Sequence, residues 1–136
     1  MKTILLDTHA ALWSAADKLS PAHQTLILIA GERDCLLMSP VSAWEIGMLV
    51  AKGRLRLPVA AADFVNDLFA GTNVTLAALT AEIAFAATTL PGNPHGDPMD
   101  RMLIATAAAY DAELMTRDRR IIEYAKKTKY IRCIAC

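Results

Sequence analysis

The sequence predicts an α/β fold in which a short central parallel β-sheet is covered by helices on both faces. The 136 residues suffice for one domain, and with 54% hydrophobic against 21% charged residues we do not expect a disordered chain. The short apolar segments are hydrophobic at nearly every position, and segments with helical signals separate them. Such strands, alternating with helices, are typical of a parallel sheet between two helical layers.

Two strands and three helices are predicted in the first third of the chain. Ser20 followed by Pro21 is an N-cap with proline at the first helical position, and Ser39 with Pro40 repeats this pattern. Gly53 then closes the second of these helices. The predicted elements are a strand over residues 3–6, a helix over 8–16, a helix over 21–30, a strand over 35–38 and a helix over 40–52.

The rest of the chain continues the alternation after one broken stretch. Residues 91–98 (PGNPHGDP) predict a loop rather than a domain linker, because too little chain follows them to fold alone. The predicted elements are a helix over 60–70, a short strand over 74–76, a helix from Thr80 that stops before Pro91, a helix over 99–110, a strand over 113–116, a helix over 118–125 and a strand over 130–134.

Charge is balanced overall but unevenly distributed. The 14 basic and 14 acidic residues argue against a protein that coats nucleic acid by bulk charge. Residues 116–136 hold seven Lys or Arg against two acids, which suits a polyanion bound beside an acidic site, although a solvated helix would look the same. No apolar run approaches the ~18 residues of a membrane span, and residues 1–7 are too short for a signal sequence. We therefore expect a cytoplasmic protein without membrane contact.

The cysteines are expected to be reduced thiols. Cys35, Cys133 and Cys136 are an odd and sparse set, which suits no disulfide framework. Cys133 and Cys136 form a CxxC pair, but a zinc site would need two further ligands at matching spacing, and none is apparent.

Four carboxylates occupy equivalent places at the ends of the predicted strands. Asp7 and Asp118 follow strands, and Glu45 and Asp100 lie in the first turns of helices. The carboxyl ends of parallel strands share one edge of a sheet, where ligands bind in such folds. Four converging carboxylates cannot all stay ionised without a cation, and their hard oxygens suit Mg²⁺ or Mn²⁺. Such a site could activate water to attack a phosphodiester.

Helix capping offers another explanation for each acid taken alone. Acids are common at helix N-termini because they accept hydrogen bonds from exposed N–H groups and complement the helix dipole. Asp7 and Asp118 could each cap a helix. Residues 42–45 (SAWE) read as a capping box, and residues 97–100 (DPMD) resemble one. Capping does not predict that the acids share one site.

Other polar and aromatic residues allow weaker interpretations. His9 could line the acidic site or simply occupy the first turn of its helix, and His95 could meet substrate from its loop. Trp13 and Trp44 lie at helical spacing among apolar residues, which favours core or dimer contacts over base stacking. Thr116 could hydrogen-bond water at the site or stabilise a turn.

Four motifs in order give the chain a family resemblance. They are residues 5–10 (LLDTHA), 39–46 (SPVSAWEI), 97–105 (DPMDRMLIA) and 115–118 (MTRD). Each is weak alone, but the ordered set resembles PIN-domain proteins, specifically VapC-type toxins of bacterial toxin–antitoxin pairs, over essentially the whole chain. The resemblance implies a PIN-like three-layer sandwich that forms a single domain over residues 1–136.

The resemblance also implies an activity. VapC-type proteins are Mg²⁺- or Mn²⁺-dependent endoribonucleases, and their four acids match Asp7, Glu45, Asp100 and Asp118, with Thr116 and Asp97 in support. The implied partners are an RNA substrate and a small cognate antitoxin, and the implied state is a homodimer. Basic residues expected to hold the RNA backbone are Arg117, Arg119, Arg120 and Lys126, with Lys52, Arg54 and Arg56 on another flank.

Two other functions stay open at the level of sequence. A non-catalytic RNA-binding or regulatory module could use the same fold, and a metal-dependent cleavage assay would separate it from an enzyme. A haloacid-dehalogenase-like phosphatase would use Asp7 as nucleophile, but that chemistry needs a second Asp two positions on, where this chain has His9.

Overall fold

The computed structural model describes residues 2–71, 73–94 and 96–136 and confirms the predicted α/β class. Within these residues, five parallel strands form one sheet in the order β3-β2-β1-β4-β5. The strands are β1 (Ile4–Leu6), β2 (Leu36–Met38), β3 (Thr75–Leu76), β4 (Glu113–Thr116) and β5 (Arg132–Ala135). The helices are α1 (Thr8–Ala15), α2 (Pro21–Glu32), α3 (Pro40–Ala51), α4 (Ala61–Gly71), α5 (Ala81–Ala86), α6 (Pro98–Ala109) and α7 (Arg119–Thr128).

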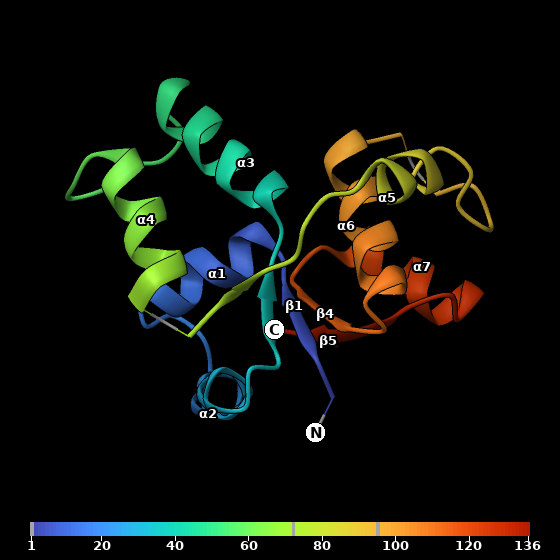
Figure 1. The fold of residues 1–136 in the computed structure, drawn as a ribbon, viewed down its shortest axis with the longest axis horizontal. Coiled ribbons are helices and arrows are strands. Elements are labelled where there is room, and N and C mark those ends of the chain that lie inside the picture. The colour runs from blue at the N-terminus through green and yellow to red at the C-terminus, as the bar shows by residue number, and fades with distance from the viewer. Residues whose placement is uncertain (1, 72, 95) are drawn as a thin grey trace.

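The central strands are apolar on both faces because each face is covered by its own core. Successive side chains of a strand point to opposite faces. Ile4 and Leu6 therefore pack in a core with α1, α2, α3 and α4, whereas Leu5 packs in a second core with α5, α6 and α7. The same helices stand on either side of the sheet in Figure 1. The molecule is a three-layer sandwich, as predicted.

The strand order places a crevice between β1 and β4. From β1 the chain proceeds to β2 and β3 on one side, and β4 and β5 lie on the other side of β1. This reversal separates the helices that follow the neighbouring strands, and open parallel sheets bind ligands at such a point. The carboxyl ends of β1 and β4 therefore mark the expected position of a functional site.

Most helices begin where the caps predict. Ser20, Ser39, Thr80 and Asp97 are N-caps, each accepting a backbone N–H with its side chain. The capping box predicted over residues 42–45 is wrong, because Ser39 caps α3. The Ser42 hydroxyl is instead fully buried and accepts a hydrogen bond from the Thr8 hydroxyl at 2.9 Å, which links α3 to α1.

Two helices end later than predicted, and a third stops before Pro91, as predicted. α2 continues to Glu32, and α7 continues to Thr128 with Lys126 and Lys127 in its last turn, where cations complement the helix dipole. α5 ends at Ala86, well before Pro91. After it, the Thr88 hydroxyl donates to the Phe85 carbonyl at 2.7 Å, and the Thr89 N–H donates to the Ala86 carbonyl at 3.2 Å.

The irregular segment after α5 is held by two side chains from helices. The Arg101 guanidinium, on α6, donates to the carbonyls of Ala87 (2.8 Å), Thr88 (3.2 Å) and Pro94 (2.8 Å). The Tyr124 hydroxyl, on α7, donates to the Pro91 carbonyl at 2.6 Å. Next to it, Gly92 has φ +73°, and a Cβ there would lie 2.8 Å from the side chain of Thr128 on α7, so glycine is required.

No helix within the described ranges is both long and apolar enough to cross a membrane.

We expect Arg101→Ala to lower the free energy of unfolding by roughly 2 kcal/mol, because three carbonyls lose a charged donor. Arg101→Lys should recover only part of this, since an ammonium group cannot reproduce the planar fork. Urea unfolding followed by circular dichroism measures both. Arg33→Ala, an exposed arginine after α2, is the control and should change the stability by less than about 0.5 kcal/mol. Equal losses of unfolding free energy for Arg101→Ala and Arg33→Ala would show that the hydrogen bonds of the Arg101 guanidinium do not stabilise the protein.

Candidate active site

The acids predicted to converge line one pocket of about 410 Å³ at the carboxyl ends of β1 and β4. Residues of α1, α3, α6 and the start of α7 line it, and Figure 1 shows α1 and α3 on one side of the sheet and α6 and α7 on the other. Its lining consists of Asp7, His9, Trp13, Glu45, Asp97, Asp100, Arg117, Asp118 and Arg120. We call it the acidic pocket.

Asp7 is the buried acid of the pocket, with 6% of its surface exposed. One carboxylate oxygen, Oδ1, accepts the backbone N–H of Thr8 at 2.6 Å, and Oδ2 accepts the hydroxyl of Thr116 at 2.6 Å. Burial raises the pKa of Asp7 and outweighs these two hydrogen bonds, which lower it; the nearby Glu45 charge raises the pKa further. The two bonds fix the orientation of the carboxylate before any ligand binds.

Thr116 connects Asp7 to Asp118. Its fully buried hydroxyl donates to Asp7 and accepts the backbone N–H of Asp118 at 3.0 Å. The Asp118 side chain then caps α7 by accepting the N–H groups of Arg120 (2.8 Å) and Ile121 (3.4 Å). The predicted supporting residue Thr116 is therefore placed between the first and fourth acids.

The other acids come from the N-terminal turns of α3 and α6. Glu45 lies one turn after Ser42, whose hydrogen bond to Thr8 ties α3 to the segment that carries Asp7. Asp97 is exposed and caps α6 by accepting the N–H groups of Met99 and Asp100. Asp100 is one turn further along the chain and is half-buried.

Electrostatic repulsion is concentrated on Asp100. Burial, as the largest cause, and the charges of Asp97, Asp118, Asp7 and Glu45 together raise the pKa of Asp100 from 3.8 to about 7. The carboxyl group of Asp100 thus interacts with four other acids. A cation bound beside it would favour the ionised form, and the proton would pass to solvent.

Capping and convergence occur together in this site. Asp7, Asp97 and Asp118 are all N-caps, as the capping interpretation predicted, and all three also line the acidic pocket. Parallel strands lead into helices whose N-termini point at the same edge, so a cap at that position also faces the crevice. The two interpretations are therefore compatible.

The oxygen donors of the pocket fit a hard divalent cation. No three His, Cys, Asp or Glu side chains in the described part of the chain are grouped so that they could hold a metal ion, so no complete coordination shell is preformed there. Mg²⁺ commonly uses one or two carboxylates and keeps several waters. The carboxylates around this pocket come from several elements, and burial and the neighbouring acids raise the pKa of Asp100. Such a site suits a Mg²⁺ ion that keeps part of its hydration shell.

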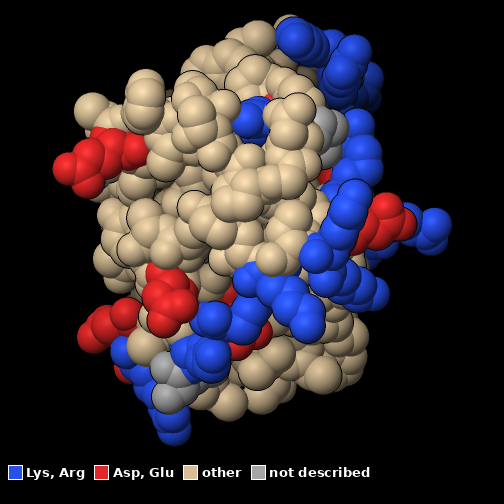
Figure 2. Space-filling model, turned by 90° about the vertical axis from the view of Figure 1, so that its right-hand side faces the viewer, with Lys and Arg blue, Asp and Glu red and all other residues tan. Residues whose placement is uncertain are grey.

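Only some of the predicted RNA-binding residues reach the pocket. Arg117 and Arg120 line it. Arg54 and Arg56 line an adjoining, largely apolar groove of about 490 Å³, which shares His9 and Trp13 with the acidic pocket. Lys126 instead faces a separate hollow between α7 and β5, and Lys52 and Arg119 are exposed and line neither the acidic pocket nor the groove. On the face that carries α7, Lys and Arg gather along one side with acids between them (Figure 2).

The histidine and tryptophan predictions have mixed outcomes. His9 occupies the first turn of α1 and also lines the acidic pocket, whereas His95 lies outside the described residues. Trp44 is 59% exposed, so it lies outside the core, and of the two predicted roles a dimer contact stays a prediction. Trp13 is half-buried against the core and lines the acidic pocket with His9, a role we did not predict. Its spacing of four residues from His9, which puts both on one face of α1, could have indicated it.

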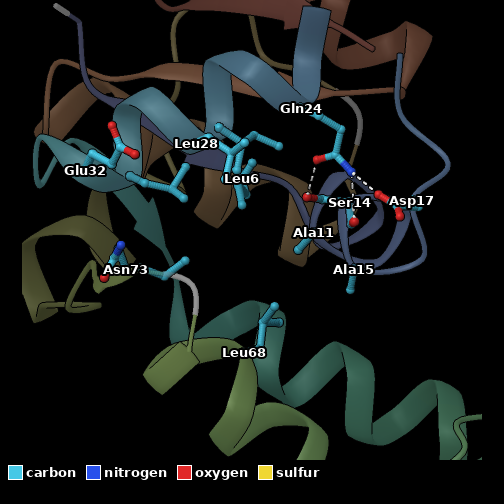
Figure 3. A pocket seen from close by; sticks show the side chains of 13 residues that line it. Leu6, Ala11, Ser14, Ala15, Asp17, Gln24, Leu28, Glu32, Leu68 and Asn73 are labelled. Atoms are coloured by element: carbon cyan, nitrogen blue, oxygen red, sulfur yellow. Dashed lines mark hydrogen bonds between the residues drawn. The ribbon is translucent and has the colours of Figure 1, made fainter. Parts of the chain in front are cut away.

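Another pocket, of about 400 Å³, lies between α1, α2 and α4 and is distinct from the acidic pocket (Figure 3). Leu6, Leu28 and Leu68 line its apolar part. At one end Gln24 donates to the Ser14 carbonyl at 3.0 Å and to Asp17 at 3.2 Å, which joins α2 to the end of α1. Among the described residues, its lining contains no basic residue and none of the acids of the acidic pocket.

Known proteins are similar to this chain in sequence or in fold. The family model of the PIN domain matches residues 4–127. Ribonuclease VapC22 from Mycobacterium tuberculosis (strain ATCC 25618 / H37Rv) is 33% identical over 123 residues, which cover 89% of this chain and 91% of the relative. Among solved structures, VapBC2 from Rickettsia felis bound to a DNA fragment from their promoter has a TM-score of 0.71 at 14% identity and covers 98% of both chains. The last likeness concerns the fold alone.

Proposed function

The chain belongs to the PIN-domain family and to its VapC-type members, and from this we propose that it is a metal-dependent endoribonuclease, the toxin of a toxin–antitoxin pair. The observation that carries the proposal is the acidic pocket, which Asp7, Glu45, Asp100 and Asp118 line. The relative that is 33% identical over most of both chains is a ribonuclease, which supports the same activity.

Asp7, Glu45, Asp100 and Asp118 would hold Mg²⁺ or Mn²⁺, with Asp97 at the edge of the pocket. The ion would polarise the scissile phosphodiester and lower the pKa of an attacking water. The protein supplies orientation: Thr116 and the Thr8 N–H hold Asp7, and the α7 cap holds Asp118. Glu45 from α3 and Asp100 from α6 contribute the other two carboxylates of the pocket.

RNA is the substrate that the surrounding charges suit. Arg117 and Arg120 line the acidic pocket, and Arg54 and Arg56 line the groove that continues from it, so a phosphate backbone would have cations on both sides of the acids. Lys52, Arg119 and Lys126 are left as weaker candidates, because they lie away from the pocket. We propose a small cognate antitoxin and a second copy of this chain as protein partners, and the cytoplasm as the location.

The non-catalytic alternative has less support. A module that only binds RNA has no need for four carboxylates in one pocket, since they repel the phosphate backbone. The phosphatase alternative needs a second Asp two residues after Asp7. His9 occupies that position, with its backbone in the first turn of α1.

Purified protein should cleave single-stranded RNA in Mg²⁺ or Mn²⁺ and stop in chelator. Asp7→Asn and Asp100→Asn should each lower the cleavage rate by at least about a hundredfold, because loss of outer-shell partners alone costs roughly 10–100-fold at metal sites. Gel analysis of labelled RNA measures this. Asp67→Asn, which removes an exposed carboxylate on α4, is the matched control and should cleave at the parent rate.

The same variants test the toxin role. Expression of the parent protein in bacteria should slow growth, and Asp100→Asn or co-expression of the cognate antitoxin should relieve it. Cleavage that persists in chelator, once contaminating nuclease is excluded, contradicts the metal mechanism. Equal growth arrest by Asp100→Asn contradicts a toxin that acts by cleaving RNA.

Asp118 allows capping and metal binding to be measured separately. Asp118→Asn keeps a good N-cap and removes the charge, so it should leave the metal-free melting temperature unchanged or raised and reduce the stabilisation by Mg²⁺. Asp118→Ala also removes the cap and should be less stable than Asp118→Asn by ~0.5–2 kcal/mol. Thermal melts with and without millimolar Mg²⁺ report both effects. A parent-like response of Asp118→Asn to Mg²⁺ would exclude Asp118 from the metal site.

The raised pKa of Asp100 predicts how the free energy of unfolding of the metal-free protein depends on pH. The pKa of this carboxyl is about 7 in the folded protein and 3.8 in the unfolded chain, so between these values the folded state binds more protons, and the stability it contributes falls as the pH rises. Metal-free Asp100→Asn should therefore be more stable than the parent at pH 8, by roughly 1–2 kcal/mol after allowance for solvent screening, with no such gain near pH 4.

Urea unfolding in chelator at the two pH values gives the difference between parent and variant. Mg²⁺ should bind the parent about tenfold more weakly at pH 6 than at pH 8, because the proton competes for Asp100. A gain in stability that is the same at both pH values would show that Asp100 does not titrate near neutrality.

A further inference from the structure

Arg117 and Trp13 make a close contact at the edge of the acidic pocket. The guanidinium carbon of Arg117 lies 3.7 Å from the centroid of the Trp13 ring. Trp13 comes from α1 and Arg117 from the segment between β4 and α7, and both side chains line the pocket. A planar cation at van der Waals distance over the face of an indole is a cation–π contact, and tryptophan is the strongest partner for it.

The two arginines of the pocket differ in what holds them. Arg120 lies 4.0 Å from Asp118, so its charge faces an acid. Arg117 is exposed, and within the described ranges neither an ion pair nor a side-chain hydrogen bond holds it. Without Trp13, an exposed arginine would populate many rotamers. The indole is therefore the contact that places this guanidinium beside the acids.

Stacking leaves the binding groups of Arg117 available. A guanidinium contacts an aromatic ring through its flat face, whereas its N–H donors lie in its plane and point outward. Those donors suit bidentate binding of a phosphate. The carboxylates of the pocket repel phosphate, so a cation fixed beside them would offset this repulsion where RNA enters.

We propose that Trp13 is a positioning residue that holds the Arg117 guanidinium at the mouth of the acidic pocket, where the guanidinium binds a phosphate of the RNA. This inference rests on the proposed ribonuclease function. It assigns to α1, through Trp13, a part in substrate binding besides the placement of Asp7.

RNA binding without turnover tests the role of Arg117. Asp100→Asn is the cleavage-deficient parent, and the probe is a short fluorescein-labelled single-stranded RNA of mixed sequence, titrated in Mg²⁺ at several salt concentrations. Arg117→Gln should reduce the slope of log K against log salt by about 0.7, the value for one lost phosphate contact on single-stranded RNA. Lys127→Gln, which removes an equal charge from the exposed last turn of α7, should leave the slope unchanged.

A double-mutant cycle tests whether Trp13 acts through Arg117. Trp13→Ala should weaken binding roughly three- to tenfold, and Trp13→Phe should keep most of the affinity because it retains an aromatic face. In the Arg117→Gln background, Trp13→Ala should have less than about a twofold effect. Additive effects would overturn the inference and indicate that Trp13 contacts the RNA itself. Full affinity in both single variants would also overturn it.

Two further measurements separate folding from function. Trp44→Phe leaves Trp13 as the sole tryptophan, because the chain has two, and Arg117→Gln should then change the tryptophan emission while Lys127→Gln does not. If Trp13→Ala has a lowered melting temperature, the RNA affinities of Trp13→Phe and Arg117→Gln are compared instead. The inference then requires that Trp13→Phe keeps most of the affinity and that Arg117→Gln loses it. The proposed function would be overturned if the Asp100→Asn protein did not bind RNA and the protein with Asp100 restored did not cleave it. If RNA is bound and cleaved, but the variants at Trp13 and Arg117 bind it with unchanged affinity, the present inference alone would be overturned.

Discussion

The hydrogen bond from the Thr116 hydroxyl to the Asp7 carboxylate joins the ends of the two central strands, and the site is built around it. Asp7 follows β1 and Thr116 ends β4, which pair directly in the sheet. Because the hydroxyl also accepts the Asp118 N–H, one buried side chain fixes both the first acid and the start of α7. A buried carboxylate that lost this donor would bear more of its desolvation cost, so the bond matters for stability as well as geometry.

Helix N-termini explain how so many acids can gather without unfolding the protein. Asp7, Asp97 and Asp118 each accept backbone N–H groups that a helix would otherwise leave without partners, and the positive end of the helix dipole offsets part of each negative charge. Asp100 is half-buried in the first turn of α6, and its pKa is raised by burial and by the charges of the neighbouring acids. The fold thus keeps the acids together, and a cation would relieve the remaining cost.

Arginine serves three purposes around this site, which its planar, permanently charged group allows. Arg101 donates hydrogen bonds to three backbone carbonyls and so holds the irregular segment that leads into α6. Arg120 faces Asp118, and Arg117 stacks on Trp13. Arg101 therefore belongs to the framework of the site, whereas Arg117 and Arg120 bring positive charge to the acidic pocket. Sequence position alone gives no sign of this division.

The sequence by itself determined the elements and the identity of the acids. Strands apolar at every position, serine–proline caps and a run of turn residues are local signals, and local propensity decides them; this is why Asp7, Glu45, Asp100 and Asp118 could be named in advance. It did not determine that α5 ends at Ala86, since tertiary contacts turn that segment, nor that Ser42 faces Thr8 rather than capping α3. Tertiary structure alone decided which cations reach the acids: Lys126 is near Arg117 in sequence but faces another hollow, whereas Trp13 meets Arg117 across about a hundred residues. Such contacts depend on how helices pack over the sheet, and packing is set by the whole chain rather than by any segment of it.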